Sequence, residues 1–180
     1  MGARIAVVFF PPEEVLEAVE GFRALHDPLA RRIDAHVAVA YPAGWLDERR
    51  ALERLRGSLS RARRRPFTLC FDGTGHTTDG LVYLRVGEGA RDLRILHHLL
   101  TDALGPPPGT VLPRYFPHLT VGRSPGEAEA EFLERQLRSR LPAGPLEVGA
   151  LALVREDAKG RWQDRHRLAL PAAGERAGVA

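Results

Sequence analysis

A short pattern that occurs twice, at residues 35–41 and 117–123, constrains the fold more than any other feature of the chain. Its two histidines, His36 and His118, lie 82 residues apart. Both segments alternate polar or small residues with valine and leucine, as half-buried β-strands do. Alternation places each histidine on one face of its strand and the larger apolar residues on the opposite face, toward the core. Two such strands predict a duplicated fold in which both imidazoles reach one site.

The residue two places beyond each histidine shares the histidine's face. It is Thr120 in the second segment and Ala38 in the first. A threonine hydroxyl can donate a hydrogen bond to a phosphate oxygen, and an alanine methyl cannot. Arg123 adds positive charge close to the second histidine, and Tyr115 is the best-placed aromatic residue to stack on a nucleobase. These positions make up the candidate site.

Two facing imidazoles can act as base and acid without a metal, because their charge changes near neutral pH. Cleavage of a phosphodiester by water needs such a pair: one group takes a proton from the water, and the other gives a proton to the leaving oxygen. The sequence contains no HExxH or CxxC signature and no cluster of carboxylates. We therefore expect neither a metal nor another cofactor.

Hydrophobic periodicity and turn residues predict the regular elements. Helices are expected at residues 13–25, 46–59, 91–104 and 127–141. Strands are expected at residues 4–10, 33–41, 66–72, 81–86, 116–123, 146–155 and 161–170, with a turn over residues 73–80. The order strand, helix, strand, strand then occurs twice. Hairpin-connected strands with covering helices indicate an α+β fold with antiparallel sheets.

The length of 180 residues and 44% hydrophobic content suit one domain, which we place at residues 1–171, followed by a flexible tail at 172–180. The net charge is +3, and Lys159 is the single lysine among 26 basic residues. Arginine dominance fits phosphate recognition, but it also fits a GC-rich genome. The run at residues 61–65 is open to the same two explanations: a solvated helix end or contact with an RNA backbone.

No apolar run is long enough to cross a bilayer, and the single Cys70 cannot form an internal disulfide. These features predict a cytoplasmic protein with no membrane partner. We also expect a monomer.

The segments His-Val-Ala-Val and Phe-Pro-His-Leu-Thr-Val-Gly-Arg resemble the paired His-x-Thr-x motifs of the two-histidine phosphoesterase superfamily, in particular its 2′-5′ RNA ligase and cyclic phosphodiesterase branch. The resemblance implies a bilobal, duplicated fold with two antiparallel sheets facing a central cleft and helices on the outer faces. It also implies that His36 and His118 are the acid–base pair and that Thr120 binds phosphate. The first motif departs from the pattern at Ala38.

The function that this resemblance implies is metal-independent hydrolysis of 2′,3′-cyclic phosphodiesters on RNA ends or nucleotides, giving 2′-phosphates, with weak reversible 2′-5′ RNA ligation. The partners are then RNA with 2′,3′-cyclic phosphate ends or cyclic nucleotides. An alternative is a nucleotide- or RNA-binding module with attenuated catalysis, which the missing hydroxyl at Ala38 favours. A small cyclic phosphate on another scaffold, such as an ADP-ribose derivative, is a third possible substrate.

Overall fold

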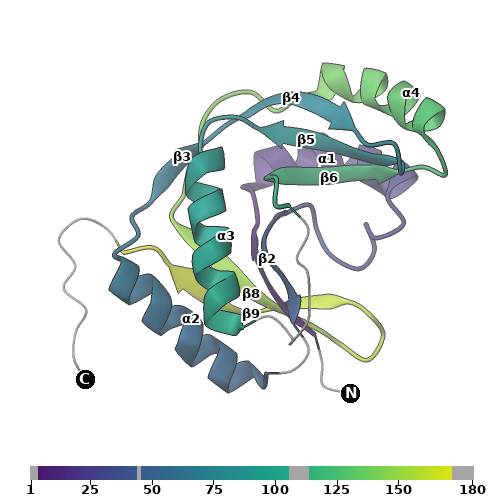
Figure 1. Ribbon diagram of the computed structural model, residues 1–180. Helices are drawn as coiled ribbons and strands as arrows, with labels where there is room; N and C mark the ends of the chain where they lie inside the picture. The colour runs from purple at the N-terminus through teal and green to yellow at the C-terminus, as the bar shows by residue number, and fades with distance from the viewer. Residues whose placement is uncertain (1–3, 44–45, 106–113, 172–180) are drawn as a thin grey trace.

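The protein is built on one seven-stranded sheet in the order β4-β5-β6-β2-β1-β8-β9, with a separate two-stranded sheet formed by β3 and β7 (Figure 1). The computed structural model describes residues 4–43, 46–105 and 114–171. The strands are β1 (Ile5–Phe9), β2 (Val37–Ala43), β3 (Phe67–Leu69), β4 (Phe71–His76), β5 (Leu81–Val86), β6 (His118–Arg123), β7 (Leu146–Val148), β8 (Ala150–Glu156) and β9 (Trp162–Ala169). Every pair of neighbouring strands is antiparallel.

Four α-helices and a short 3₁₀ turn accompany the strands in the described part of the chain. They are α1 (Glu13–His26), α2 (Glu48–Ala62), α3 (Ala90–Leu104), α4 (Glu127–Leu137) and the 3₁₀ turn η1 (Arg138–Arg140). Helix α3 packs on β2, α1 packs on β6, and α4 covers β4 and β5 (Figure 1). None of these helices is long and apolar enough to cross a membrane.

The chain folds as two interleaved copies of one unit. The order β1-α1-β2-α2-β3-β4 is followed by β5-α3-β6-α4-β7-β8, and α3 begins 77 residues after α1, as β7 begins 79 residues after β3. Exchanging the two units turns the sheet order β4-β5-β6-β2-β1-β8 into itself read backwards. An approximate two-fold axis therefore passes between β2 and β6, and β9 is an additional strand at one edge.

The two copies meet where β2 pairs with β6, at Val37 and Leu119. These residues are fully buried and belong to the main core, together with Phe22 of α1 and Leu96 of α3. Helices α1 and α3 thus cover the same face of the central strands. The alternate residues of both strands project to the opposite, open face, which is where the histidine-bearing positions lie.

The predicted α+β fold with antiparallel sheets is confirmed. The repeat is bounded differently from the expected one: it includes the strand and helix that precede each histidine strand, so β5 begins the second copy instead of ending the first, and β9 lies outside the repeat. The turn expected at residues 73–80 is wrong in its first half, because β4 continues through His76. The glycines there allow close packing: a Cβ added at Gly75 would lie 2.6 Å from the Tyr83 ring. Glycine in this strand makes room for a neighbouring side chain rather than ending the strand.

Two of the expected strands each divide in the structure. Residues 66–72 break at Cys70 and residues 146–155 break at Gly149, so the first part of each leaves the large sheet and pairs with the other as β3 and β7. The helix expected at 127–141 ends at Leu137 and tightens into the 3₁₀ turn. The tail at residues 172–180 lies outside the described residues.

Candidate active site

His36 and His118 are held in the same way in the two halves of the molecule. The Nδ1 atom of His36 lies 2.8 Å from the carbonyl oxygen of Asp34, and that of His118 lies 2.9 Å from the carbonyl oxygen of Phe116. A carbonyl oxygen only accepts, so Nδ1 carries a hydrogen in both rings. In the neutral imidazole the other nitrogen, Nε2, is then the proton acceptor.

The register between β2 and β6 brings the two histidines together. Val37 pairs with Leu119. Continuing this antiparallel register by one residue places His36 across from Thr120 and Ala38 across from His118. The two histidines are thus diagonal neighbours on one face, with backbones about 7–8 Å apart. This spacing leaves room for a phosphate group between the rings.

Burial lowers the pKa of both imidazoles below the ordinary value of 6.5, although the backbone carbonyl that each ring contacts acts in the opposite direction. The charge of Arg23 and the second imidazole also lower the pKa of His36. The charge of Arg123 lowers the pKa of His118. Both rings are therefore poised in the neutral form at neutral pH, and an anionic ligand between them would favour protonation of one of them.

Polar and aromatic side chains surround the second histidine. Strand β5 pairs Arg85 with His118 and Tyr83 with Thr120. The Tyr83 ring lies 5.4 Å from the His118 ring, and the 40% exposed Phe116 stacks on His118 at 4.2 Å. The Nε of Arg85 is 2.8 Å from an oxygen of Asp72. This ion pair leaves the terminal amino groups of the guanidinium available to a phosphate.

Apolar side chains surround the first histidine. Strand β1 pairs Val8 with Ala38, and the Phe10 ring lies 6.2 Å from the His36 ring in an edge-to-face arrangement. Val8 belongs to a small apolar cluster on this face with Val154 of β8, and Trp162 packs against it. The open face is thus apolar immediately beside the first histidine and polar beside the second.

Four of the predicted site residues lie on the two strands that the sequence indicates: Ala38 on β2, and His118, Thr120 and Arg123 on β6. His36 lies directly before β2. Thr120 and Ala38 are half-buried on the open face, next to the histidines. Arg123 is exposed at the end of β6 and acts on His118 through its charge. Ala38 lies across from His118. The first motif lacks a hydroxyl at this position, and the consequence falls on the histidine of the second motif, which has no hydroxyl beside it on β2.

Tyr115 occupies a different place from the one predicted. It is 8% exposed, its ring stacks on His97 of α3 at 4.0 Å, and its hydroxyl donates to the carbonyl oxygen of Ala38 at 2.8 Å. Nδ1 of His97 in turn lies 2.8 Å from the carbonyl oxygen of Val39. Because both faces of a buried, stacked ring are unavailable to a nucleobase, we assign Tyr115 a positioning role: with His97 it fixes the backbone of β2.

A buried ionic network positions the segment that leads to the first histidine. Arg23 on α1 is 2% exposed and donates to Asp27, to Glu20 and to the carbonyl oxygen of Ile33. Glu20 also accepts a hydrogen bond from the backbone N–H of Ala35. The sequence signal for this network is the helical spacing of Glu20, Arg23 and Asp27, which places them on one side of α1.

Tyr83 and Arg85 are site residues that the sequence reasoning missed. The alternation in β5 could have revealed them, because Val82, Leu84 and Val86 are buried and the two residues between them face the other way. Across the described residues, no group of three histidine, cysteine, aspartate or glutamate side chains is arranged to hold a metal ion.

The duplicated fold and the symmetric pair of histidines define a two-histidine phosphoesterase. Residues 11–160 match the family model of the 2′-5′ RNA ligase superfamily. The chain belongs to this superfamily.

Solved structures show the same fold. E. coli LigT complexed with 3′-AMP is 22% identical with a TM-score of 0.66, over 94% of this chain and 99% of that one. A crystal structure described as a phosphoesterase is also 22% identical, with a TM-score of 0.64 over 93% of this chain and 98% of that one. No curated protein matches the chain.

Proposed function

We propose that the protein hydrolyses 2′,3′-cyclic phosphodiesters on RNA ends or nucleotides without a metal ion and leaves 2′-phosphates. The observation that carries this proposal is the equivalent anchoring of His36 and His118 on one open face, each with Nδ1 held by a backbone carbonyl. Two imidazoles of this kind can exchange protons with groups on opposite sides of a phosphate through their Nε2 atoms. The ligands of the LigT structures, 3′-AMP and phosphate, support a nucleotide phosphate as substrate.

In the proposed reaction, one neutral imidazole takes a proton from a water molecule as the water oxygen bonds to phosphorus. The bond between phosphorus and O3′ breaks, and the other imidazole, in its protonated form, gives a proton to O3′. The products are a 2′-phosphate and a 3′-hydroxyl. A 5′-hydroxyl of RNA in place of water would give a 2′-5′ linkage, so we include weak ligation by the same site in the proposal.

The side chains around the second histidine are suited to hold the phosphate. The Thr120 hydroxyl can donate to a non-bridging oxygen, and the guanidinium groups of Arg85 and Arg123 supply charge on the same side. The exposed Phe116 ring, rather than Tyr115, offers an aromatic surface for a base.

A nucleotide- or RNA-binding module with attenuated catalysis is the second candidate. The observation that favours it is Ala38, whose methyl lies across from His118 where a hydroxyl could donate to the developing charge. Retention of both anchored histidines favours the hydrolase, because binding alone needs no pair of proton-transfer groups.

The test is turnover of 2′,3′-cyclic AMP by the purified chain in the presence of EDTA, with the product identified by chromatography against 2′-AMP and 3′-AMP. The hydrolase proposal expects 2′-AMP to accumulate and the His118→Ala variant to be inactive. Saturable binding without turnover would favour the binding module. Turnover that EDTA abolishes and a divalent ion restores would contradict a metal-independent mechanism.

A further inference from the structure

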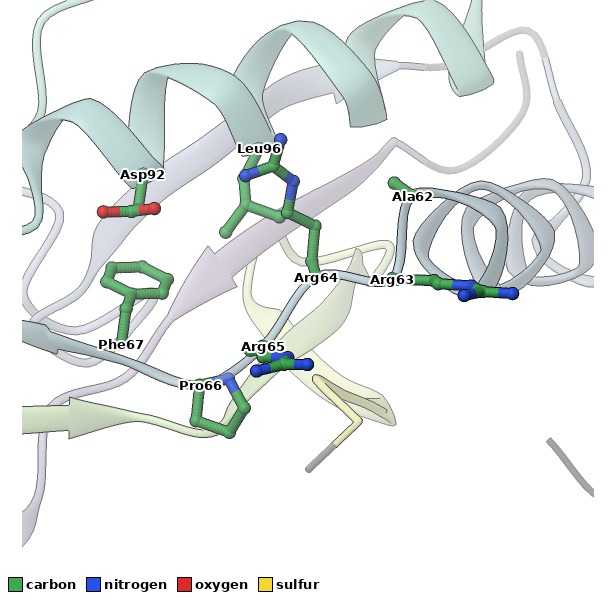
Figure 2. A pocket seen from close by; sticks show the side chains of 8 residues that line it. All are labelled: Ala62, Arg63, Arg64, Arg65, Pro66, Phe67, Asp92 and Leu96. Carbon is green, nitrogen blue, oxygen red and sulfur yellow. The ribbon is translucent and has the colours of Figure 1, made fainter. Parts of the chain in front are cut away.

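A pocket lies where α2 ends and α3 begins, away from the open face that carries His36 and His118, here called the catalytic face (Figure 2). It has a volume of about 410 Å³, which is within the range of small-molecule sites. The residues that matter for its chemistry are Arg63, Arg64, Arg65, Phe67, Asp92 and Leu96. Three arginines and a single carboxylate give the pocket a net positive charge.

The positive charge of this pocket is not neutralised within the described chain. None of its three arginine side chains forms an ion pair or hydrogen bond with another described residue. The Nε of Arg64 is buried without any hydrogen-bond partner, and Figure 2 shows this side chain extended toward α3 beside Leu96. A buried donor that lacks an acceptor is costly in a folded protein. A phosphate oxygen of a ligand in the pocket can supply the acceptor that this Nε lacks among the described residues.

The backbone turns sharply where these arginines leave α2, and Figure 2 shows Arg64 as the one of the three that extends toward α3. Arg63 ends α2 in the left-handed conformation, with φ of 48°, and among the described non-glycine residues it alone has a positive φ. Glycine usually occupies this position at a helix end. The turn carries Arg64 and Arg65 beyond the last helical turn of α2. Attraction to the helix dipole accounts for a positive charge at Arg61, in the last turn, but not for the charges at Arg64 and Arg65.

The pocket is separate from the catalytic histidines. Helix α3 packs on the core-facing side of β2, where His97 contacts the carbonyl oxygen of Val39. The histidines of the active site project from the opposite side of the same sheet. A ligand in the pocket would therefore lie on the helical side of the molecule.

We propose that this pocket binds a nucleotide phosphate at a site distinct from the catalytic face. Arg64 and Arg65 provide guanidinium donors suited to phosphate oxygens. The Phe67 ring offers an apolar face to a base, and Figure 2 shows the Asp92 carboxylate beside that ring, where it can accept a hydrogen bond from a base amino group or a ribose hydroxyl. The nucleotide can be free or part of an RNA strand. This proposal does not depend on the hydrolase activity.

The experiment measures binding of AMP and of a single-stranded hexaribonucleotide by calorimetry, in a His36→Ala/His118→Ala background that impairs the catalytic face. Arg64→Gln is compared with Arg61→Gln, which removes the same charge from the same basic run but from outside the pocket. We expect Arg64→Gln to weaken binding about tenfold or more, and Arg61→Gln to change it less than about twofold. Arg64→Lys keeps the charge but loses the planar fork, so it should restore only part of the affinity.

A dependence on Arg64 for AMP supports a free nucleotide as ligand, and a dependence seen only with the hexanucleotide supports a nucleotide within RNA. Equal weakening by Arg64→Gln and Arg61→Gln would overturn the proposal, because it would indicate a diffuse charge effect. Absence of binding by both probes would also overturn it. The Nε–H resonance of Arg64 in nuclear magnetic resonance spectra, identified by its loss in Arg64→Lys, locates the ligand. It should shift on addition of the probe that binds, and no shift at saturation with that probe contradicts the site.

Discussion

Equivalent histidines lie directly before β2 and at the start of β6, but the strands beside these two present different side chains to the open face. Next to β6, Arg85 lies beside His118 and Tyr83 beside Thr120. Next to β2, the ring of Phe10 lies beside His36, and Val8 pairs with Ala38. The backbone is nearly two-fold symmetric, whereas the chemistry around it is not.

The comparison separates two tasks that the duplicated fold performs. Symmetric anchoring of Nδ1 gives both imidazoles the same proton-transfer capacity, and the repeated backbone is sufficient for this. Phosphate recognition needs charge and hydroxyl groups, and these are concentrated around the second histidine. We infer that the phosphate is bound mainly by the second half, while the first half supplies an imidazole and an apolar wall.

The largest expected effect is the loss of either histidine. If the halves are equivalent in proton transfer, His36→Ala and His118→Ala should each lower kcat at least about 10²-fold, the usual scale for general acid or base help. The measurement is steady-state hydrolysis of 2′,3′-cyclic AMP, with His98→Ala on α3 as a histidine control that should remain active. A His36→Ala variant with nearly full activity would show that the first half plays no part in proton transfer.

The pH profile tests the shared environment of the two rings. Because burial lowers the pKa of both below 6.5, and one ring must be protonated while the other is neutral, kcat/KM should be bell-shaped with its maximum below pH 6.5. As pH rises above the higher of the two values the acid is lost, and the rate should fall about tenfold per pH unit. A maximum above pH 8 would contradict the assignment of both roles to imidazoles.

Adding the missing hydroxyl makes the two motifs alike. Ala38→Thr places a donor across from His118, and a hydrogen bond to a charged oxygen is worth about 1.5–3 kcal/mol. We expect kcat for 2′,3′-cyclic AMP to rise roughly tenfold. Ala38→Val is the matched control, because valine has a volume similar to that of threonine but no hydroxyl. An equal change in both variants, or no gain in a folded Ala38→Thr protein, would favour the binding module over the hydrolase.

Arginine replacement tests whether the second half carries the phosphate. Arg85→Lys and Arg123→Lys keep the charge but remove the planar fork, so each should lower kcat/KM roughly three- to tenfold. Arg49→Lys is the control, because that side chain is exposed and its one ion pair among the described residues is with Glu53 on its own helix. Identical kinetics in all three variants would make both arginines structural and would weaken the proposed asymmetry.

The smallest expected effect concerns the support beneath the first motif. Tyr115→Phe removes the hydroxyl that donates to the Ala38 carbonyl, which should lower the free energy of unfolding by about 1 kcal/mol. Urea denaturation measures this change. Tyr83→Phe removes a hydroxyl with no hydrogen bond to a described residue, so it should leave stability nearly unchanged. A fully stable Tyr115→Phe protein would show that the contact does not hold β2 in place.

The sequence by itself determined the two histidine strands, their shared face and most of the helices. Alternation and helical spacing are local properties, so His36, Ala38, His118 and Thr120 could be placed on one face from the order of residues alone. The same local signals failed at residues 73–76, where glycine, usually a turn residue, serves in a strand because the Tyr83 ring packs over Gly75.

Only the tertiary structure decided which side chains surround the histidines. The position of Tyr115 just before the second motif does not reveal that its ring turns inward and stacks on His97. That contact joins segments that lie apart in the chain. The pairing of β5 with β6 brings Arg85 to His118, and the pairing of β1 with β2 brings Val8 to Ala38. Strand pairing depends on packing of the whole core, so local periodicity can assign a residue to a face but cannot name its neighbour across the sheet.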